Sequence, residues 1–143
     1  MRFSEAVRLG ALMHPQSFGG MRDSKGGTCA LGSALDAIGA LTSKAGGPGA
    51  MDDFIRIMTI WPALGKRAAV PCPAGCSLSK HFEANRTTAM VWHLNDRHSW
   101  TREAIADWYE LTFESTELTH PSAEQITKMT PAFQEVQDVT STL

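Results

Sequence analysis

Long apolar runs are missing from this sequence. Nowhere in its 143 residues is there a stretch close to the roughly 18 consecutive apolar residues that a transmembrane helix needs. The first residues, Met1 to Glu5, also lack the apolar segment of a secretory signal. These absences predict a protein that does not enter a membrane, and we expect a cytoplasmic location.

An excess of charge of one sign is also missing. The formal net charge is −2, which gives little electrostatic reason to bind nucleic acid or an anionic membrane. The acids are unevenly placed, since six acids and one base follow from Glu110 onward. We therefore expect one globular domain over residues 1–118 and an acidic C-terminal helix or tail over residues 119–143.

Cysteine is scarce, with only three residues of this type. An odd number and the lack of a signal segment argue against a secreted disulfide framework. In a reducing compartment, clustered cysteines are more often metal ligands or catalytic thiols. Hydrophobic residues make up 43% of the chain, enough for a folded core.

Helical patterns dominate what is present. Apolar spacing and end signals predict helices over residues 4–13, 29–38 and 52–61, the first two capped by Ser4 and Thr28. Small residues in the second segment suit close helix packing, which places it at the centre of the fold. Residues 87–94 fit a strand or a helix, and we favour a helix. The predicted fold class is mainly α, a small single domain whose C-terminal half resembles a zinc knuckle.

The pattern C-x3-C-x16-H-x4-H joins Cys72, Cys76, His93 and His98. Zinc prefers four sulfur and nitrogen ligands in a tetrahedron, and closely spaced pairs supply them. Pro73 and Gly75 allow a tight turn between the cysteines. The histidines reach one ion only if the helix breaks between them, near Asn95 and Asp96. Four protein ligands leave no place for water, so we expect a structural zinc.

Alternatives to this ligand set remain open. His81 is a substitute for either histidine, and Cys29 is a possible fourth ligand. Asp96 is a candidate partner that fixes a histidine tautomer. A further alternative has no metal at all, with both cysteines as small buried residues in a proline turn and the histidines as ordinary polar residues.

A capped helix follows the histidines. Thr101 is its predicted N-cap, Trp100 and Ile105 form a hydrophobic staple, and Trp108 and Leu111 continue the buried stripe. Tryptophans in such a pattern are more often core residues than binding groups, although Trp100 stays a candidate for binding. Two basic residues beside the site are candidates for contact with a phosphate or carboxylate, with solvated charges as the alternative. They are Arg97 and Arg102.

Cys29 offers a competing chemistry. A cysteine in the first turn of a helix gains thiolate stability from the helix dipole. With His93 and then Asn95 or Asp96, it would complete a cysteine hydrolase in papain-like order. The residues around Cys29 do not form a protease signature, and a small buried cysteine is the preferred interpretation.

A DNA-binding regulator is the third class. A helix-turn-helix would begin at Ser99–Trp108 and needs a second, basic helix. Residues 111–119 do not supply one, because their charged residues are acidic.

Two motifs resemble a family of small uncharacterised proteins of bacteria, phages and prophages. They are Thr-Cys-Ala-Leu-Gly-Ser-Ala at residues 28–34 and His-Leu-Asn-Asp-x-His-x-Trp-Thr-Arg-Glu-x-Ile-Ala-x-Trp at residues 93–108. The resemblance covers most of residues 3–108, although that family carries a tighter Cys-Pro-x-Cys pair. It implies a phage or prophage origin and a host-cytoplasmic or virion setting, and it implies nothing about activity. We therefore expect a non-enzymatic accessory or virion protein that contacts protein, through residues 52–61 and the acidic tail.

Overall fold

The computed structural model of the chain describes residues 1–44 and 50–115. The chain divides into two units, Met1–Glu110 and Leu111–Leu143. The first unit holds the site and almost all of the described secondary structure. The predicted boundary after residue 118 and the predicted acidic tail lie outside the described residues.

The described residues are mainly helical, as the sequence predicts, and their strand-like pairing is limited to isolated bridges. Residues 87–94, which also fitted a strand, lie within a helix. The elements in chain order are α1 (Phe3–Ala11), α2 (Ala30–Ala37), α3 (Ala50–Ile60), the 3-10 turn η1 (Pro62–Gly65), α4 (Ser79–Glu83), α5 (Thr87–Asp96), α6 (Arg102–Tyr109) and the π-helical turn η2 (Glu110–Glu114).

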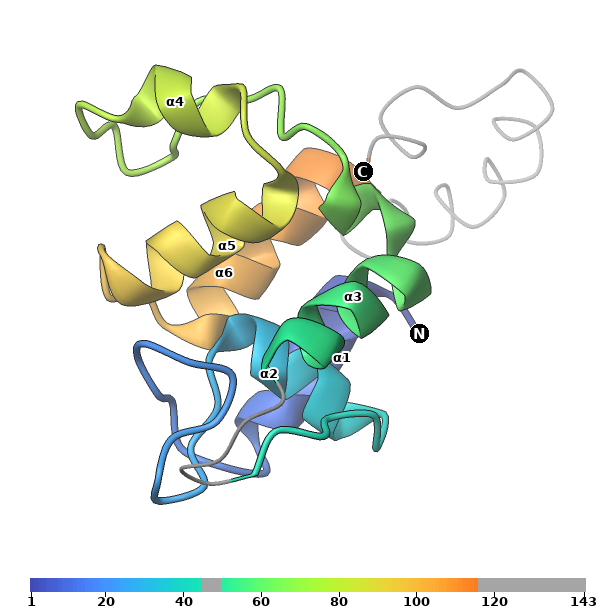
Figure 1. The fold of residues 1–143 in the computed structure, drawn as a ribbon. Helices are drawn as coiled ribbons and strands as arrows, with labels where there is room; N and C mark the ends of the chain where they lie inside the picture. The colour runs from blue at the N-terminus through green and yellow to red at the C-terminus, as the bar shows by residue number, and fades with distance from the viewer. Residues whose placement is uncertain (45–49, 116–143) are drawn as a thin grey trace, which may run out of the picture. The chain divides into compact units, whose positions relative to one another are not determined.

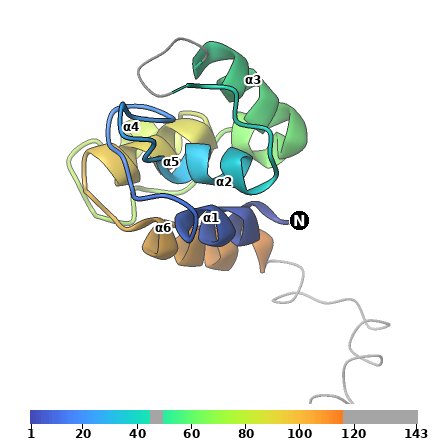
Figure 2. The same cartoon turned by 90° about the horizontal axis from the view of Figure 1, so that it is seen from below.

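Helix α2 lies at the centre of the first unit, as its small residues predicted (Figures 1 and 2). It contacts α1, α3, α5 and α6, and its residues 30–35 are all buried. Two glycines allow this close packing. A Cβ on Gly10 would lie 1.9 Å from the Ser33 carbonyl oxygen, and one on Gly32 would lie 2.1 Å from that of Met21.

The ends of the first two helices differ from the prediction. Arg2, not Ser4, is the N-cap of α1, and Ser4 is buried inside the first turn. Cys29, not Thr28, caps α2, since its sulfur accepts the Gly32 N–H. Thr28 is instead buried, with its hydroxyl 2.8 Å from that of Ser33. Polar residues next to a helix start suit capping and core bonding equally well, so the sequence pattern could not separate the two roles.

Helix α6 begins where predicted, because the Thr101 hydroxyl accepts the Ala104 N–H at 3.1 Å. Its buried face differs from the prediction. Tyr109 is buried beside Ile105, whereas Trp108 is only half-buried and Leu111 is 76% exposed. Both Trp108 and Tyr109 fit the helical spacing from Ile105. Tyr109 is the one that faces the core, because its ring centroid lies 4.7 Å from that of Phe3 on α1.

No helix within the described ranges has the length and apolar character needed to cross a lipid bilayer.

Candidate metal centre

The two cysteines lie in the loop between η1 and α4. Gly75 has φ +68° and donates its N–H to the Cys72 carbonyl at 2.9 Å, which makes the tight turn predicted between them. The Ser79 hydroxyl accepts the Cys72 N–H at 2.9 Å and so ties the loop to the start of α4. This folding brings the two sulfurs within 4.8 Å of each other, with Cys72 buried and Cys76 half-buried.

The two histidines come from the end of α5 and the turn that follows it. His93 lies in the last turn of the helix, which ends at Asp96, and His98 lies two residues beyond that end. Ser99 follows in the left-handed region at φ +52°, where the chain turns toward α6. The helix therefore ends between the two histidines, close to the predicted Asn95–Asp96 break.

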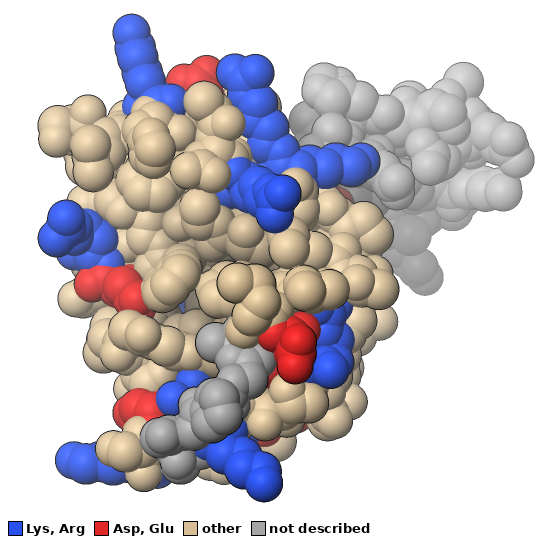
Figure 3. Space-filling model, viewed as in Figure 1, with Lys and Arg blue, Asp and Glu red and all other residues tan. Residues whose placement is uncertain are grey.

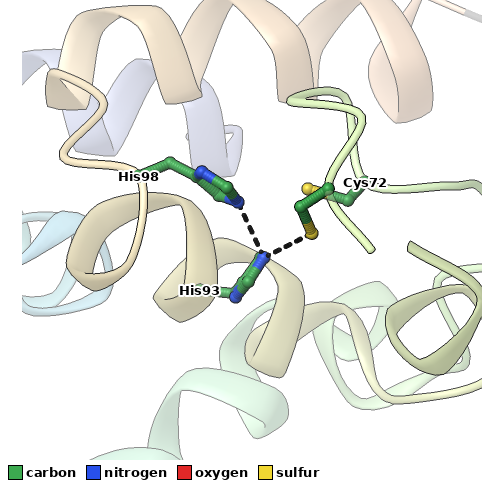
Figure 4. A group of neighbouring side chains, drawn as sticks. Cys72, His93 and His98 are labelled. Carbon is green, nitrogen blue, oxygen red and sulfur yellow. Dashed lines mark hydrogen bonds between the residues drawn. The ribbon is translucent and has the colours of Figure 1, made fainter. Parts of the chain in front are cut away.

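All four ligand atoms lie within 4.8 Å of one another. The Nε2 atoms of His93 and His98 are 3.0 Å apart, and the Cys76 sulfur is 3.4 Å from His93 Nε2. Figure 4 shows the two rings and the Cys72 side chain directed toward a common point. Zinc bonds of about 2.3 Å to sulfur and about 2.0 Å to nitrogen set tetrahedral separations of about 3.3 Å (N to N) and about 3.5 Å (N to S). The cluster is thus close enough to bind a metal ion and has dimensions compatible with zinc.

The two pKa shifts within the cluster act on metal binding in opposite directions. Burial, and then the charge of His98, lower the pKa of His93 and keep its ring in the neutral form that binds metals. Burial raises the pKa of the Cys72 thiol, so that this group loses its proton only to a strong partner such as a cation. Metal binding would therefore release protons, and acid would oppose it.

The alternative ligands lie outside this cluster. His81 is exposed on α4, with its ring nitrogen 3.4 Å from the Asn85 amide. Cys29 is occupied as the cap of α2. Asp96, expected to orient a histidine, instead accepts hydrogen bonds from the Trp92 indole and the Asn95 amide.

The surroundings of Cys29 oppose the predicted thiolate. The side chain is buried, and burial raises the pKa of its thiol to about 11 despite the hydrogen bond from Gly32. Asn95 is equally committed, since its oxygen accepts the Ala30 N–H and the Gln16 amide. His93 faces Cys76 and His98. The members of the alternative cysteine hydrolase are therefore engaged in separate contacts.

Arg102, a candidate for contact with a phosphate or carboxylate, is bonded inside the protein instead. It is 5% exposed, and its guanidinium donates to the hydroxyls of Thr28 and Ser33 at 3.0 and 2.9 Å. It also donates to the His14 carbonyl at 2.7 Å. Arg97 is exposed and Trp100 is half-buried, so only these two of the predicted binding residues reach the surface.

Two contributors to the site escaped the sequence analysis. Phe82 on α4 stacks on the His93 ring with centroids 3.9 Å apart and an interplanar angle of 24°. Trp92 lies one residue before His93 and is 38% exposed. The sequence indicated Phe82 and Trp92 only through their positions near predicted ligands. A single aromatic residue in a short helix forms no recognisable pattern.

Comparisons with known proteins give no family for this chain. No family model, no curated protein and no solved structure matches it. The resemblance to small phage and prophage proteins therefore stays a prediction.

Proposed function

We propose that this protein is a non-enzymatic module with a structural zinc site, and that it acts by contacting another protein. One observation supports the zinc most strongly. Two sulfurs and two ring nitrogens from a loop, a helix end and a following turn converge within 4.8 Å. Two of the four residues, Cys72 and His93, are buried, and buried polar groups need a partner that compensates for the loss of water.

The ligand set favours a structural over a catalytic role. Two thiolates and two imidazoles complete a tetrahedral shell, so no position stays open for water or substrate. The ion would join the Cys72–Cys76 loop to the end of α5. It would thereby hold α4, which has no buried residue of its own, against the rest of the unit.

Exposed apolar side chains support a role in protein contact. Helix α3 carries Met51 and Ile55, which are 72% and 56% exposed. Figure 3 shows that the Lys and Arg side chains of one face stand apart in small groups with uncharged surface between them. This surface suits a protein partner better than the phosphate backbone of DNA. The acidic segment 119–143 is the second candidate surface.

The proposed location is based on the resemblance to small phage and prophage proteins and on the chemistry of the thiols. A reducing compartment keeps the cysteines available to metal, which fits host cytoplasm or a virion assembled there. The proposal is thus an accessory or virion protein of a phage or prophage.

Elemental analysis tests the zinc directly. Protein purified without chelator should contain about one zinc per chain. Cys72→Ser and His98→Ala should each lose most of it, whereas His81→Ala, a matched change of an exposed histidine, should retain it. The proposal fails if unmodified protein contains no zinc, or if the His81 and His98 variants lose it equally.

A further inference from the structure

A hollow of about 250 Å³ lies beside the metal centre, lined by Phe82, Ala89, Trp92, His93 and Asp96. Sites for drug-sized ligands usually measure about 300–1,000 Å³. The hollow is therefore sized for a single long side chain rather than for a whole small-molecule ligand. We call it the Trp92 pocket.

Aromatic rings form much of its wall. Phe82 is held by its stacking on His93, and the Trp92 ring lies 5.4 Å from that of Phe54. The Trp92 indole N–H is bonded to Asp96, which fixes the orientation of its ring. Rigid ring faces of this kind attract cations through their quadrupole.

Asp96 is the one acidic residue among those that line the pocket. Its carboxylate accepts hydrogen bonds from Trp92 and from the Asn95 amide, and the residue stays partly exposed. With zinc bound, two thiolates balance the charge of the ion, and the imidazoles are neutral. The metal centre then adds no net charge, so the pocket carries the negative charge of Asp96.

We propose that the Trp92 pocket binds the ammonium group of a lysine side chain on the partner protein. The methylene chain would lie along the rings of Phe82 and Trp92, and the ammonium would reach the Asp96 carboxylate. This inference rests on the proposed function, because the lysine would belong to the protein that this chain is proposed to contact. Zinc contributes by holding His93 and, through it, Phe82.

The test is an NMR titration of the full chain, with its zinc content measured on the same sample. The probes are two blocked tripeptides, Gly-Lys-Gly and Gly-norleucine-Gly, which differ only by the ammonium group that lysine carries on its Cε in place of a hydrogen atom. We expect the lysine peptide to shift the Trp92 indole N–H and the Ala89 amide, and to bind roughly fivefold more tightly than the norleucine peptide.

Two variants separate the charge of Asp96 from general effects. Asp96→Asn keeps the size and an acceptor for Trp92 and should weaken lysine binding roughly fivefold. Glu103→Gln removes the same charge from the exposed surface of α6 and should leave binding unchanged.

Equal binding of the two peptides, or no shift at Trp92 and Ala89, overturns the proposal. Unchanged lysine binding in Asp96→Asn overturns it as well. If Asp96→Asn does not fold, the comparison of peptides on the unmodified protein still decides. Lysine binding by protein that was purified without chelator and contains no zinc would contradict the zinc proposal and leave this one standing.

Discussion

Among single residues, buried polar side chains do the most to hold the elements around the metal centre. Asn95, in the same last turn of α5 as His93, bonds to the start of α2 and to the Ser17 carbonyl. Arg102 bonds to residues on both sides of the loop between α1 and α2, to the His14 carbonyl and the Ser33 hydroxyl. These bonds fix the two ends of the segment between α5 and α6, in which His98 lies.

Replacing Arg102 by alanine should cost about 2–4 kcal/mol of unfolding free energy, because buried hydroxyls and a carbonyl would lose a charged donor. Chemical denaturation measures this change. Arg97→Ala is the matched control, since Arg97 is exposed, and should change stability by less than about 0.5 kcal/mol. Equal effects of the two substitutions would contradict the structural role of Arg102.

Asp53 makes stability depend on pH. Its side chain is fully buried and accepts the N–H groups of Thr42 and Ser43 at 3.0 and 2.8 Å. Burial alone would raise the pKa of Asp53, but hydrogen bonds from Ser43 and Thr42 outweigh it and hold this pKa below its ordinary value. A lowered folded-state pKa stabilises the protein above the unfolded pKa, and the gain is lost as pH falls through the folded value.

We therefore expect Asp53→Asn to destabilise the protein most at neutral pH. The difference from the unmodified protein should begin to shrink as pH falls below about 4, where the unfolded chain takes up a proton at this carboxylate, and should reach its minimum below the lowered folded-state pKa. Denaturation at a series of pH values measures it. Asp52→Asn, at an exposed neighbour, should show no such trend, and a pH-independent difference for Asp53→Asn would be evidence against the account.

For single residues, the sequence predicted which side chains form the metal-ligand cluster but not the roles of the buried polar residues around it. The four metal-ligand candidates came from spacing and do lie together. Arg102 and Asn95 were assigned possible surface or catalytic roles because polarity normally indicates exposure. Their burial depends on partners 60 or more positions away, such as Ser33 and Ala30, which no local pattern shows.

At the scale of helices, the close approach of α1 to α2 is the main determinant of the core. Gly10 has no space for a methyl group, since a Cβ there would lie 1.9 Å from the Ser33 carbonyl oxygen. Exposed helical glycines normally gain stability when replaced by alanine. Here the sign is reversed, because backbone rather than a flexible side chain blocks the space.

Gly10→Ala should therefore lower the unfolding free energy by about 1–3 kcal/mol. The control is Gly20→Ala, where the nearest atom to a new Cβ would be 3.8 Å away, and it should change stability by about 0.5 kcal/mol or less. Thermal or chemical denaturation of both variants gives the comparison. A stabilised Gly10→Ala protein would show that α1 and α2 pack less closely than described.

Most helices were predictable from apolar spacing and caps, with ends that differ by a few residues. Helix α3, for example, spans Ala50–Ile60 rather than 52–61. Helix α4 was not predicted. It is five residues long and has no buried residue, so it carries no amphipathic pattern, and its position depends on the adjacent cysteine loop.

At the scale of the whole first unit, the cysteine–histidine cluster and the helical core lie in different segments of the chain. The core is formed where α1, α2 and α6 pack together, with buried residues such as Phe3, Leu31 and Ile105. The zinc would instead join the 72–83 segment to α5. A chain of this length can form its core without a metal.

Removing zinc with a chelator should consequently loosen the structure locally. Amide hydrogen exchange should become faster across residues 72–83, while amides of α1, α2 and α6 remain protected. Cys72→Ser should reproduce this pattern without chelator. Uniform loss of protection over the whole unit would mean that the metal holds the core as well.

The mainly α class was predictable because helical spacing recurs along the chain, and the structure confirms it. The arrangement of the helices was not predictable beyond the central place of α2, since it depends on contacts between distant residues. The function, the protein partner and the phage setting stay predictions. They depend on molecules outside this chain.

The central claim is a closed zinc site with two sulfur and two nitrogen ligands. Zinc K-edge X-ray absorption on protein purified without chelator tests it most directly. We predict two sulfurs at about 2.3 Å and two nitrogens at about 2.0–2.1 Å, with no oxygen ligand. Absence of zinc, or a shell that contains water or carboxylate oxygen in place of these ligands, would contradict it.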